Sequence, residues 1–162
     1  MRRATLCAAV LALVAAMPAS AALPLRGVLV PGQSLGGVRL GESATQVASL
    51  GFHGVCRGCT ATTWYFTYRP FDKHGLGVEL SRGRVSAVYT LWRPAGWHGP
   101  PGVSLGASNG QVTSVVGPLV VIYCTSYQAL VADGPSSRTA YYIVDGRLWG
   151  YGLFPRGANP CR

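Results

Sequence analysis

Apolar and polar residues alternate along this chain with two different periods, which predict two kinds of element. Helical spacing follows two serine–glutamine pairs, Ser43 with Gln46 and Ser108 with Gln111. In a capping box the serine side chain accepts a hydrogen bond from the backbone N–H of the glutamine. The glutamine side chain in turn accepts one from the backbone N–H of the serine. The apolar stripes that follow are Val47 and Leu50, then Val112, Val115 and Val116. Gly51 and Gly117 are placed to end two short helices as left-handed residues.

The second period is two residues, and it predicts strands. Residues 62–68 alternate strictly, with Trp64, Phe66 and Tyr68 on one face. Asp145-Gly146 is a strong signal for a type I′ hairpin turn. The other expected strands cover 77–80, 85–91, 119–123, 127–131, 139–144 and 147–154. Each predicted helix is therefore followed by an antiparallel β-meander.

The chain also repeats itself. Residues 37–49 and 102–114 lie 65 positions apart, and eight of their thirteen aligned residues are identical. An internal repeat constrains the architecture before other signals do. We therefore expect an α+β fold of two tandem repeats, each a short helix followed by an antiparallel β-meander. The repeats cover about 28–92 and 102–154 of a single domain, 23–162, and the Pro/Gly-rich segment 93–101 is the expected hinge.

The helix-opening residues resemble those of known small domains. The two copies match at Leu40-Gly41, Ser43, Val47 and Gly51, and at Leu105-Gly106, Ser108, Val112 and Gly117. With a meander and a cysteine pair in each copy, the pattern resembles the beta-lactamase inhibitor protein fold. It is also similar to the single-copy domain of small outer-membrane lipoprotein assembly factors. The resemblance covers roughly residues 28–154.

This resemblance implies protein binding by a curved sheet. The position after the glycine, usually Met in those families, is Glu42 in the first copy and Ala107 in the second. Nothing matches the inhibitory loops, so the resemblance does not imply lactamase inhibition. The pattern Trp149-Gly150-Tyr151-Gly152 also resembles that of uncharacterised secreted bacterial proteins, which adds no mechanism.

The first 22 residues have the form of a secretory signal peptide. Arg2 and Arg3 form a basic start, and residues 4–16 are mostly apolar but too few to span a bilayer. The small residues that follow predict cleavage after Ala21 or Ala22. A membrane anchor is the alternative interpretation. We expect a secreted, extracellular protein with no membrane span after cleavage.

Four cysteines remain after cleavage, because Cys7 lies within the signal. An even number of cysteines in a secreted chain indicates disulfides. The expected pairs are Cys56 with Cys59 and Cys124 with Cys161. Two other interpretations of the first pair stay open. A thioredoxin-type redox pair needs a helix after the motif, and a zinc knuckle needs a second close pair.

Charge and the polar residues exclude several classes of function. Cleavage lowers the formal net charge from +9 to +7, because Arg2 and Arg3 leave. The basic residues are scattered, whereas nucleic-acid binding favours a clustered stripe, so we expect no nucleic-acid partner. The excess of Arg over Lys reflects either codon bias or a surface that attracts acidic partners. Five acids and three histidines form no catalytic or metal-binding motif. We expect no enzyme, no metal and no cofactor.

Tyrosine and tryptophan are more frequent than a small core requires, at eight and four residues. If the helices cover one face of a sheet, the other face shows aromatic rings with interspersed Arg. That composition is typical of protein interfaces, and it equally suits stacking on sugar rings. The alternative is that the aromatic rings are packing residues, buried beneath loops on both faces of the sheet.

The meeting point of the two halves is the predicted binding site. Its candidate residues are Trp92, Arg93, Trp97, Arg147, Trp149 and Tyr151. A loop pinned by Trp97 is the alternative to a groove at the hinge. We expect a non-catalytic protein that binds an extracellular or cell-envelope protein. The alternative ligand is a cell-wall or extracellular polysaccharide, and a small secreted enzyme is the third hypothesis.

Overall fold

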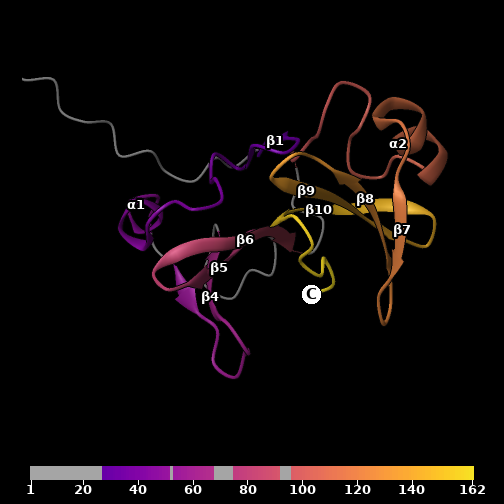
Figure 1. The fold of residues 1–162 in the computed structure, drawn as a ribbon. Helices are drawn as coiled ribbons and strands as arrows, with labels where there is room; N and C mark the ends of the chain where they lie inside the picture. Colours follow the sequence, from indigo (N-terminus) through magenta and orange to yellow (C-terminus); the bar gives the residue numbers. More distant parts are fainter. Residues whose placement is uncertain (1–26, 52, 68–74, 92–95) are drawn as a thin grey trace, which may run out of the picture.

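The computed structural model describes residues 27–51, 53–67, 75–91 and 96–162, and most of its regular structure is β (Figure 1). The helices are α1 (Ala44–Ala48) and α2 (Asn109–Val116). The strands are β1 (Leu29–Val30), β2 (Ser34–Leu35), β3 (Gly54–Val55), β4 (Thr62–Thr67), β5 (Gly75–Ser81), β6 (Arg84–Leu91), β7 (Val120–Tyr123), β8 (Gln128–Asp133), β9 (Ser137–Val144) and β10 (Arg147–Pro155). The expected signal, 1–22, lies outside the described residues, as do Trp92 and Arg93.

Eight of these strands form one antiparallel sheet in the order β3-β4-β5-β6-β10-β9-β8-β7. The central pairing joins β6 to β10, with Gly152 opposite Tyr89 and Leu153 opposite Val88. Beside it, the Thr90 hydroxyl accepts a hydrogen bond of 2.7 Å from the amide of Tyr151. Strands β1 and β2 form a separate two-stranded sheet.

The expected α+β fold of two helix-plus-meander repeats is wrong. Strands make up 48% of the described residues and helices 11%, and the eight main strands belong to one continuous sheet. Helices of five and eight residues are too short to form a layer over that sheet. The strong helix-opening signals describe the caps correctly, but they say nothing of how the strands pair across the chain.

Both capping boxes are confirmed. The side chain of Ser43 accepts from the amide of Gln46 at 3.3 Å, and that of Ser108 accepts from the amide of Gln111 at 3.2 Å. The reciprocal bonds from the serine amides to the glutamine side chains measure 2.9 and 2.8 Å. Gly117 ends α2 with φ 93° and ψ −154°, a positive φ but not the left-handed helical conformation. These bonds fix the residue at which each helix begins.

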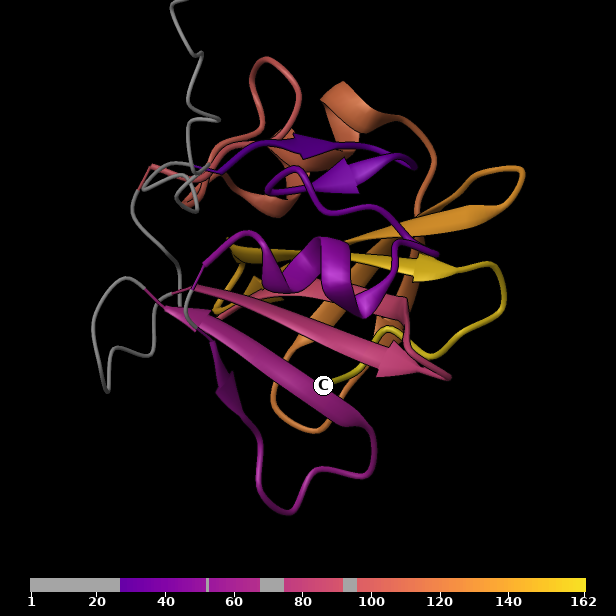
Figure 2. The same cartoon turned by 90° about the vertical axis from the view of Figure 1, so that its left-hand side faces the viewer.

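The large core lies on one face of the sheet. Figures 1 and 2 show α1, α2 and the β1–β2 pair on this side. Val47 of α1 and Val112 of α2 are fully buried there, together with Leu76 and Val78 of β5. Alternation on β4 places Trp64 and Phe66 toward this core, as the sequence predicted. The opposite face of the sheet carries a second, smaller cluster.

Both expected cysteine pairs are confirmed as disulfides, Cys56–Cys59 and Cys124–Cys161. Strand β4 follows the first pair, so the helix that a thioredoxin-type motif needs is not there. Within the described ranges, no helix combines the length and apolar character needed to cross a membrane.

Candidate functional site

The second face of the sheet is rich in aromatic rings, and we call it the aromatic face. Its rings are Tyr65, Tyr89, Tyr127, Tyr142 and Phe154, among small residues of β6, β8 and β9. Glycines directly beneath two of these rings leave room for them. A Cβ added at Gly77 would lie 2.6 Å from the Tyr89 ring, and one at Gly152 would lie 2.4 Å from the Phe154 ring. The rings therefore cover the backbone of glycine positions in the sheet.

Residues 156–162, the C-terminal segment, pack on the aromatic face. The hydroxyl of Tyr142 donates to the carbonyl of Pro160 at 2.8 Å, and that of Tyr127 donates to the carbonyl of Arg162 at 2.7 Å. The guanidinium of Arg138 holds the carbonyl of Ala158 at 2.9 Å. The disulfide from Cys161 to Cys124 ties the segment to the end of β7. In Figure 1 the C-terminus accordingly lies on the side of the sheet away from the helices.

Arg162 places a positive charge among these rings. Its guanidinium makes a two-point ion pair with Glu79 of β5, in which Nη2 lies 3.0 Å from Oε2 and Nε bonds Oε1. Its Cζ lies 4.7 Å from the centroid of Phe154 and 5.8 Å from that of Tyr89. Ring faces attract a cation, so the ion pair and the rings hold the same guanidinium.

A pocket of about 480 Å³ opens on this face, and we call it the aromatic pocket. Its lining residues are Tyr65, Tyr89, Thr90, Ser126, Tyr127, Tyr142, Val144, Trp149 and Arg162. They come from β4, β6, β9, β10, the turn between β7 and β8, and the C-terminal segment, so the pocket spans the central β6–β10 pairing. Because rings form most of its wall, the pocket suits an apolar or aromatic group.

Tyr89 and Tyr142 of the pocket stay protonated at neutral pH. Burial raises the pKa of Tyr142 well above its ordinary value. Burial is also the main cause that raises the pKa of Tyr89, and the neighbouring Tyr65 and Glu79 raise it further. Both hydroxyls are therefore hydrogen-bond donors and carry no charge of their own.

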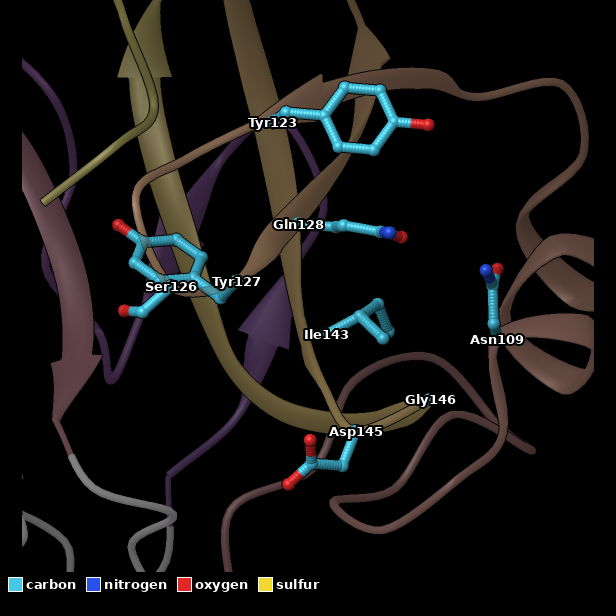
Figure 3. A pocket seen from close by; sticks show the side chains of 8 residues that line it. All are labelled: Asn109, Tyr123, Ser126, Tyr127, Gln128, Ile143, Asp145 and Gly146. Carbon is cyan, nitrogen blue, oxygen red and sulfur yellow. The ribbon is translucent and has the colours of Figure 1, made fainter.

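A second hollow, the polar groove, has a volume of about 530 Å³ (Figure 3). It is lined by Asn109, Tyr123, Ser126, Tyr127, Gln128, Ile143, Asp145 and Gly146. Tyr123 and Gln128 face each other across β7 and β8, and Gln128 faces Ile143 across β8 and β9. Figure 3 shows these three side chains pointing the same way, with the Asn109 carboxamide opposite them at the start of α2. Ser126 and Tyr127 line both hollows.

Of the six predicted binding residues, the four that the structure describes do not form one site. Trp97 is 2% exposed and packs against Gly27 and Gly36, where an added Cβ would lie 2.2 and 2.8 Å from its ring. Tyr151 is fully buried, and its hydroxyl donates to the carbonyl of Val103 at 3.0 Å. These two residues belong to the core, so neither can contact a partner while the core is closed. The described part of the hinge, 96–101, is thus the loop pinned by its tryptophan.

The two predicted residues on β10 that remain accessible point to different places. Arg147 is exposed and its Nη1 lies 3.4 Å from the carbonyl of Gly106, away from the aromatic pocket. Trp149 is half-buried and lines the pocket. A β-bulge between Leu148 and Gly150 shifts the register there, so Trp149 and Tyr151 serve opposite faces although two positions separate them. Simple alternation would have placed them together.

Tyr65, Tyr89, Tyr127 and Tyr142 belong to the excess of tyrosine in the sequence but are not among the predicted site residues. Glycines at alternate strand positions, Gly75 with Gly77 and Gly150 with Gly152, were the available signal. Such glycines mark places where another group approaches the backbone closely. Arg162 and Glu79 had no local signal, because their contact depends on the path of the C-terminal segment.

The described residues contain no group of three or more His, Cys, Asp or Glu side chains that could hold a metal ion. Their polar groups around the aromatic pocket are hydroxyls and one ion pair. This arrangement can hold a ligand by ring contacts and hydrogen bonds.

Comparison with known proteins adds a single weak likeness. No protein-family model and no curated protein matches the chain. Among solved structures, the chain is similar to the crystal structure of a DUF4309 family protein (YjgB) from Bacillus subtilis subsp. subtilis, at 14% sequence identity and a TM-score of 0.45. The match covers 63% of this chain and 68% of that chain. The beta-lactamase inhibitor-like fold expected from the sequence is not confirmed.

Proposed function

We propose that this chain is a secreted, non-catalytic binding protein that engages an extracellular or cell-envelope protein through its aromatic face. The observation that carries the proposal is the aromatic pocket, where Tyr65, Tyr89, Tyr127, Tyr142 and Trp149 surround one hollow with Arg162. Tyr, Trp and Arg are the residue types that dominate binding energy at protein interfaces.

The pocket is preorganised. Tyr127 and Tyr142 are fixed by their bonds to the C-terminal segment, and the Cys124–Cys161 disulfide holds that segment in place. Groups that are already ordered lose little conformational entropy when a partner binds. The rigid pocket therefore favours tight binding of a single projecting side chain.

Charge balance indicates the character of that side chain. Glu79 neutralises Arg162 inside the site, so the pocket offers no free charge to a partner. An apolar or aromatic anchor fills the space without leaving a buried charge unpaired. The net positive charge of the chain, +9 before cleavage, attracts an acidic protein to the surrounding surface.

Secretion is part of the proposal. The two disulfides are of the kind that persists in oxidising compartments, and the first 22 residues have the composition of a signal peptide. Intact-mass measurement of protein from the culture medium tests this point. Mature chains that begin at Ala22 or Leu23 are expected, and a chain that retains Met1 would contradict secretion by this signal.

The binding experiment uses the full mature chain, immobilised and exposed to the secreted and envelope fractions of its source organism. A captured protein is identified, and its dissociation constant is measured with the unmodified chain and with two variants. Trp149→Ala should weaken binding by a factor of about 30, since losing an anchor removes roughly 2 kcal/mol. Arg147→Ala, on an exposed site of the same strand, should leave it unchanged.

Melting temperatures of the same samples separate loss of the site from loss of the fold. Trp149→Ala should still unfold in one cooperative transition, at a melting temperature lowered by only a few degrees, because the ring is only half-buried. Equal affinity of the parent and Trp149→Ala would rule out the aromatic pocket as the binding site.

A further inference from the structure

The polar groove presents an exposed ring beside two carboxamides. Tyr123 is 77% exposed at the edge strand β7, and the register of the sheet sets Gln128 directly beside it. Side chains opposite each other on neighbouring strands lie about 5 Å apart at Cβ. Asn109 stands across the groove from Gln128 (Figure 3). A ligand in the groove would therefore lie against the ring and between the amides.

The carboxamides keep hydrogen-bonding capacity for a ligand. Within the described part of the chain, the Gln128 side chain makes no hydrogen bond, so both its donor and its acceptor are available. The Oδ1 of Asn109 accepts from the Thr113 hydroxyl at 3.3 Å, which leaves the amide group of Asn109 as a donor. The main chain of Asn109 is fixed to the carbonyl of Gly146 at 3.2 Å. The Asn109 carboxamide is thus held in place by a contact that leaves its NH2 group available.

The groove offers no counter-charge to an anionic ligand. Neither Lys nor Arg lines it, and Asp145 is the one acidic residue in its lining. Figure 3 shows this carboxylate pointing away from Gln128 and Asn109. A neutral ligand that offers hydroxyl groups and an apolar ring face meets every feature of the groove.

We propose that the polar groove binds a neutral oligosaccharide, with one pyranose ring stacked on Tyr123. Adjacent sugar hydroxyls donate and accept at once, as the carboxamides of Gln128 and Asn109 do. The carbon face of the sugar lies on the tyrosine ring, and Ile143 forms the apolar floor. This site lies beyond the proposed protein-binding function. Its distinctive residues, Asn109, Tyr123 and Gln128, are not part of the aromatic pocket.

The test uses chitohexaose, cellohexaose and mannohexaose as probes with the full mature chain in calorimetric titration. At least one probe should bind with a dissociation constant below about 1 mM, the weak end of specific affinity. Tyr123→Ala and Gln128→Ala should each weaken that binding by about tenfold or more. Tyr123→Trp should preserve it, since indole offers a larger stacking face. In NMR spectra, the side-chain amide signals of Gln128 and Asn109 should shift during titration.

Two matched controls separate this site from the others. Val120→Ala changes another exposed residue of β7, with 56% exposure against 77% for Tyr123, and should leave the sugar affinity unchanged. Trp149→Ala should also leave the sugar affinity unchanged, although it should weaken binding of the protein partner. The two proposals can therefore fail independently. The inference is overturned if none of the three sugars binds, or if Val120→Ala weakens binding as much as Tyr123→Ala. The second result would place the sugar along the edge of β7 and outside the groove.

Discussion

Arg162 and Glu79 form a two-point ion pair across the aromatic face, although 83 positions separate them in the chain. The pair joins the C-terminal segment to β5, on the far half of the sheet from the disulfide that anchors Cys161 to Cys124. Both side chains are mostly covered, at 25% and 14% exposure. The segment is therefore attached to the sheet at both of its halves, and the shape of the aromatic pocket depends on it.

Removing one partner of this pair should destabilise the protein. Glu79→Gln keeps the size of the side chain but leaves Arg162 without a counter-charge, and should lower the free energy of unfolding by about 2 kcal/mol. The measurement is urea denaturation of the variant and the parent. Asp133→Asn is the matched control, because Asp133 pairs with Arg138 but is 40% exposed, where such pairs contribute less than about 1 kcal/mol. Equal losses of unfolding free energy in the two variants would show that the Arg162–Glu79 pair contributes no more than an exposed ion pair.

The long disulfide should contribute more stability than the short one. Cys124–Cys161 closes a loop of 37 positions, and Cys56–Cys59 closes one of three. In the chain-entropy model these loops correspond to about 4 and about 2 kcal/mol. Paired Cys→Ser replacements, followed by denaturation, measure both values. The first replacement should also speed hydrogen exchange around Tyr127, because the C-terminal segment is released; protection identical to the parent would contradict the role of the disulfide in holding it.

The two capping boxes should have similar energetic value. Ser43→Ala and Ser108→Ala each remove the acceptor for an amide at the start of a helix, and each should cost about 1 kcal/mol. Thermal or chemical denaturation gives the change. Ser104→Ala, an exposed serine whose side chain makes no hydrogen bond among the described residues, is the control and should have no effect. Unchanged midpoints in both cap variants would mean that the helix starts are fixed by packing alone.

Two buried tyrosines should respond oppositely to loss of their hydroxyls. Tyr151 donates to the carbonyl of Val103 at 3.0 Å, whereas the hydroxyl of Tyr141 is buried without a hydrogen-bond partner in the described structure. Tyr151→Phe should cost about 1 kcal/mol, and Tyr141→Phe should be neutral or stabilising, because an unpaired buried hydroxyl is itself unfavourable. Their rings touch edge to face with centroids 6.1 Å apart, so both variants keep the same packing. Equal losses would indicate that Tyr141 has a water or another partner.

Alkaline pH should destabilise the fold through ionisation of Tyr141. Burial raises the pKa of Tyr141 from 10.0 to about 12. The unfolded chain therefore loses this proton first, and stability that is complete below pH 10 falls as the pH rises toward 12. The check is the free energy of unfolding at a series of pH values above 9. Tyr141→Phe should reduce the slope, and an unchanged slope would assign the alkaline loss to other groups.

Local signals in the sequence predicted local structure well. The serine–glutamine spacing identified both helix starts, and Asp145-Gly146 forms the expected turn, with φ values of 49° and 71°. Alternation placed Trp64 and Phe66 on the face that packs against the helices. Cysteine number indicated two disulfides, and both expected pairs form. In each case the physical cause lies within a few residues, or in a count that the compartment constrains.

The site was not predictable in the same way. The bulge between Leu148 and Gly150 places Trp149 on the aromatic face and leaves Tyr151 in the core. The residues around this bulge do not specify its position. Trp97 reads as an exposed hinge residue until its packing against Gly36 is known. Arg162 meets Glu79 only because the C-terminal segment crosses the sheet. These features depend on contacts between distant parts of the chain, which composition and spacing do not encode.

Strand β10 lies in the middle of the sheet, although it is the last strand along the described chain. Its neighbours β6 and β9 have inner edges that only β10 can pair, so the nascent chain exposes two open strand edges until residues 147–155 arrive. A chain that emerges N-terminus first, from a ribosome or a translocation pore, cannot close its sheet until residues 147–155 have passed. Cleavage before β10 would leave one fragment with a four-stranded and a three-stranded sheet, each with an unpaired inner edge. The order of the strands thus delays closure of the sheet until β10 is available.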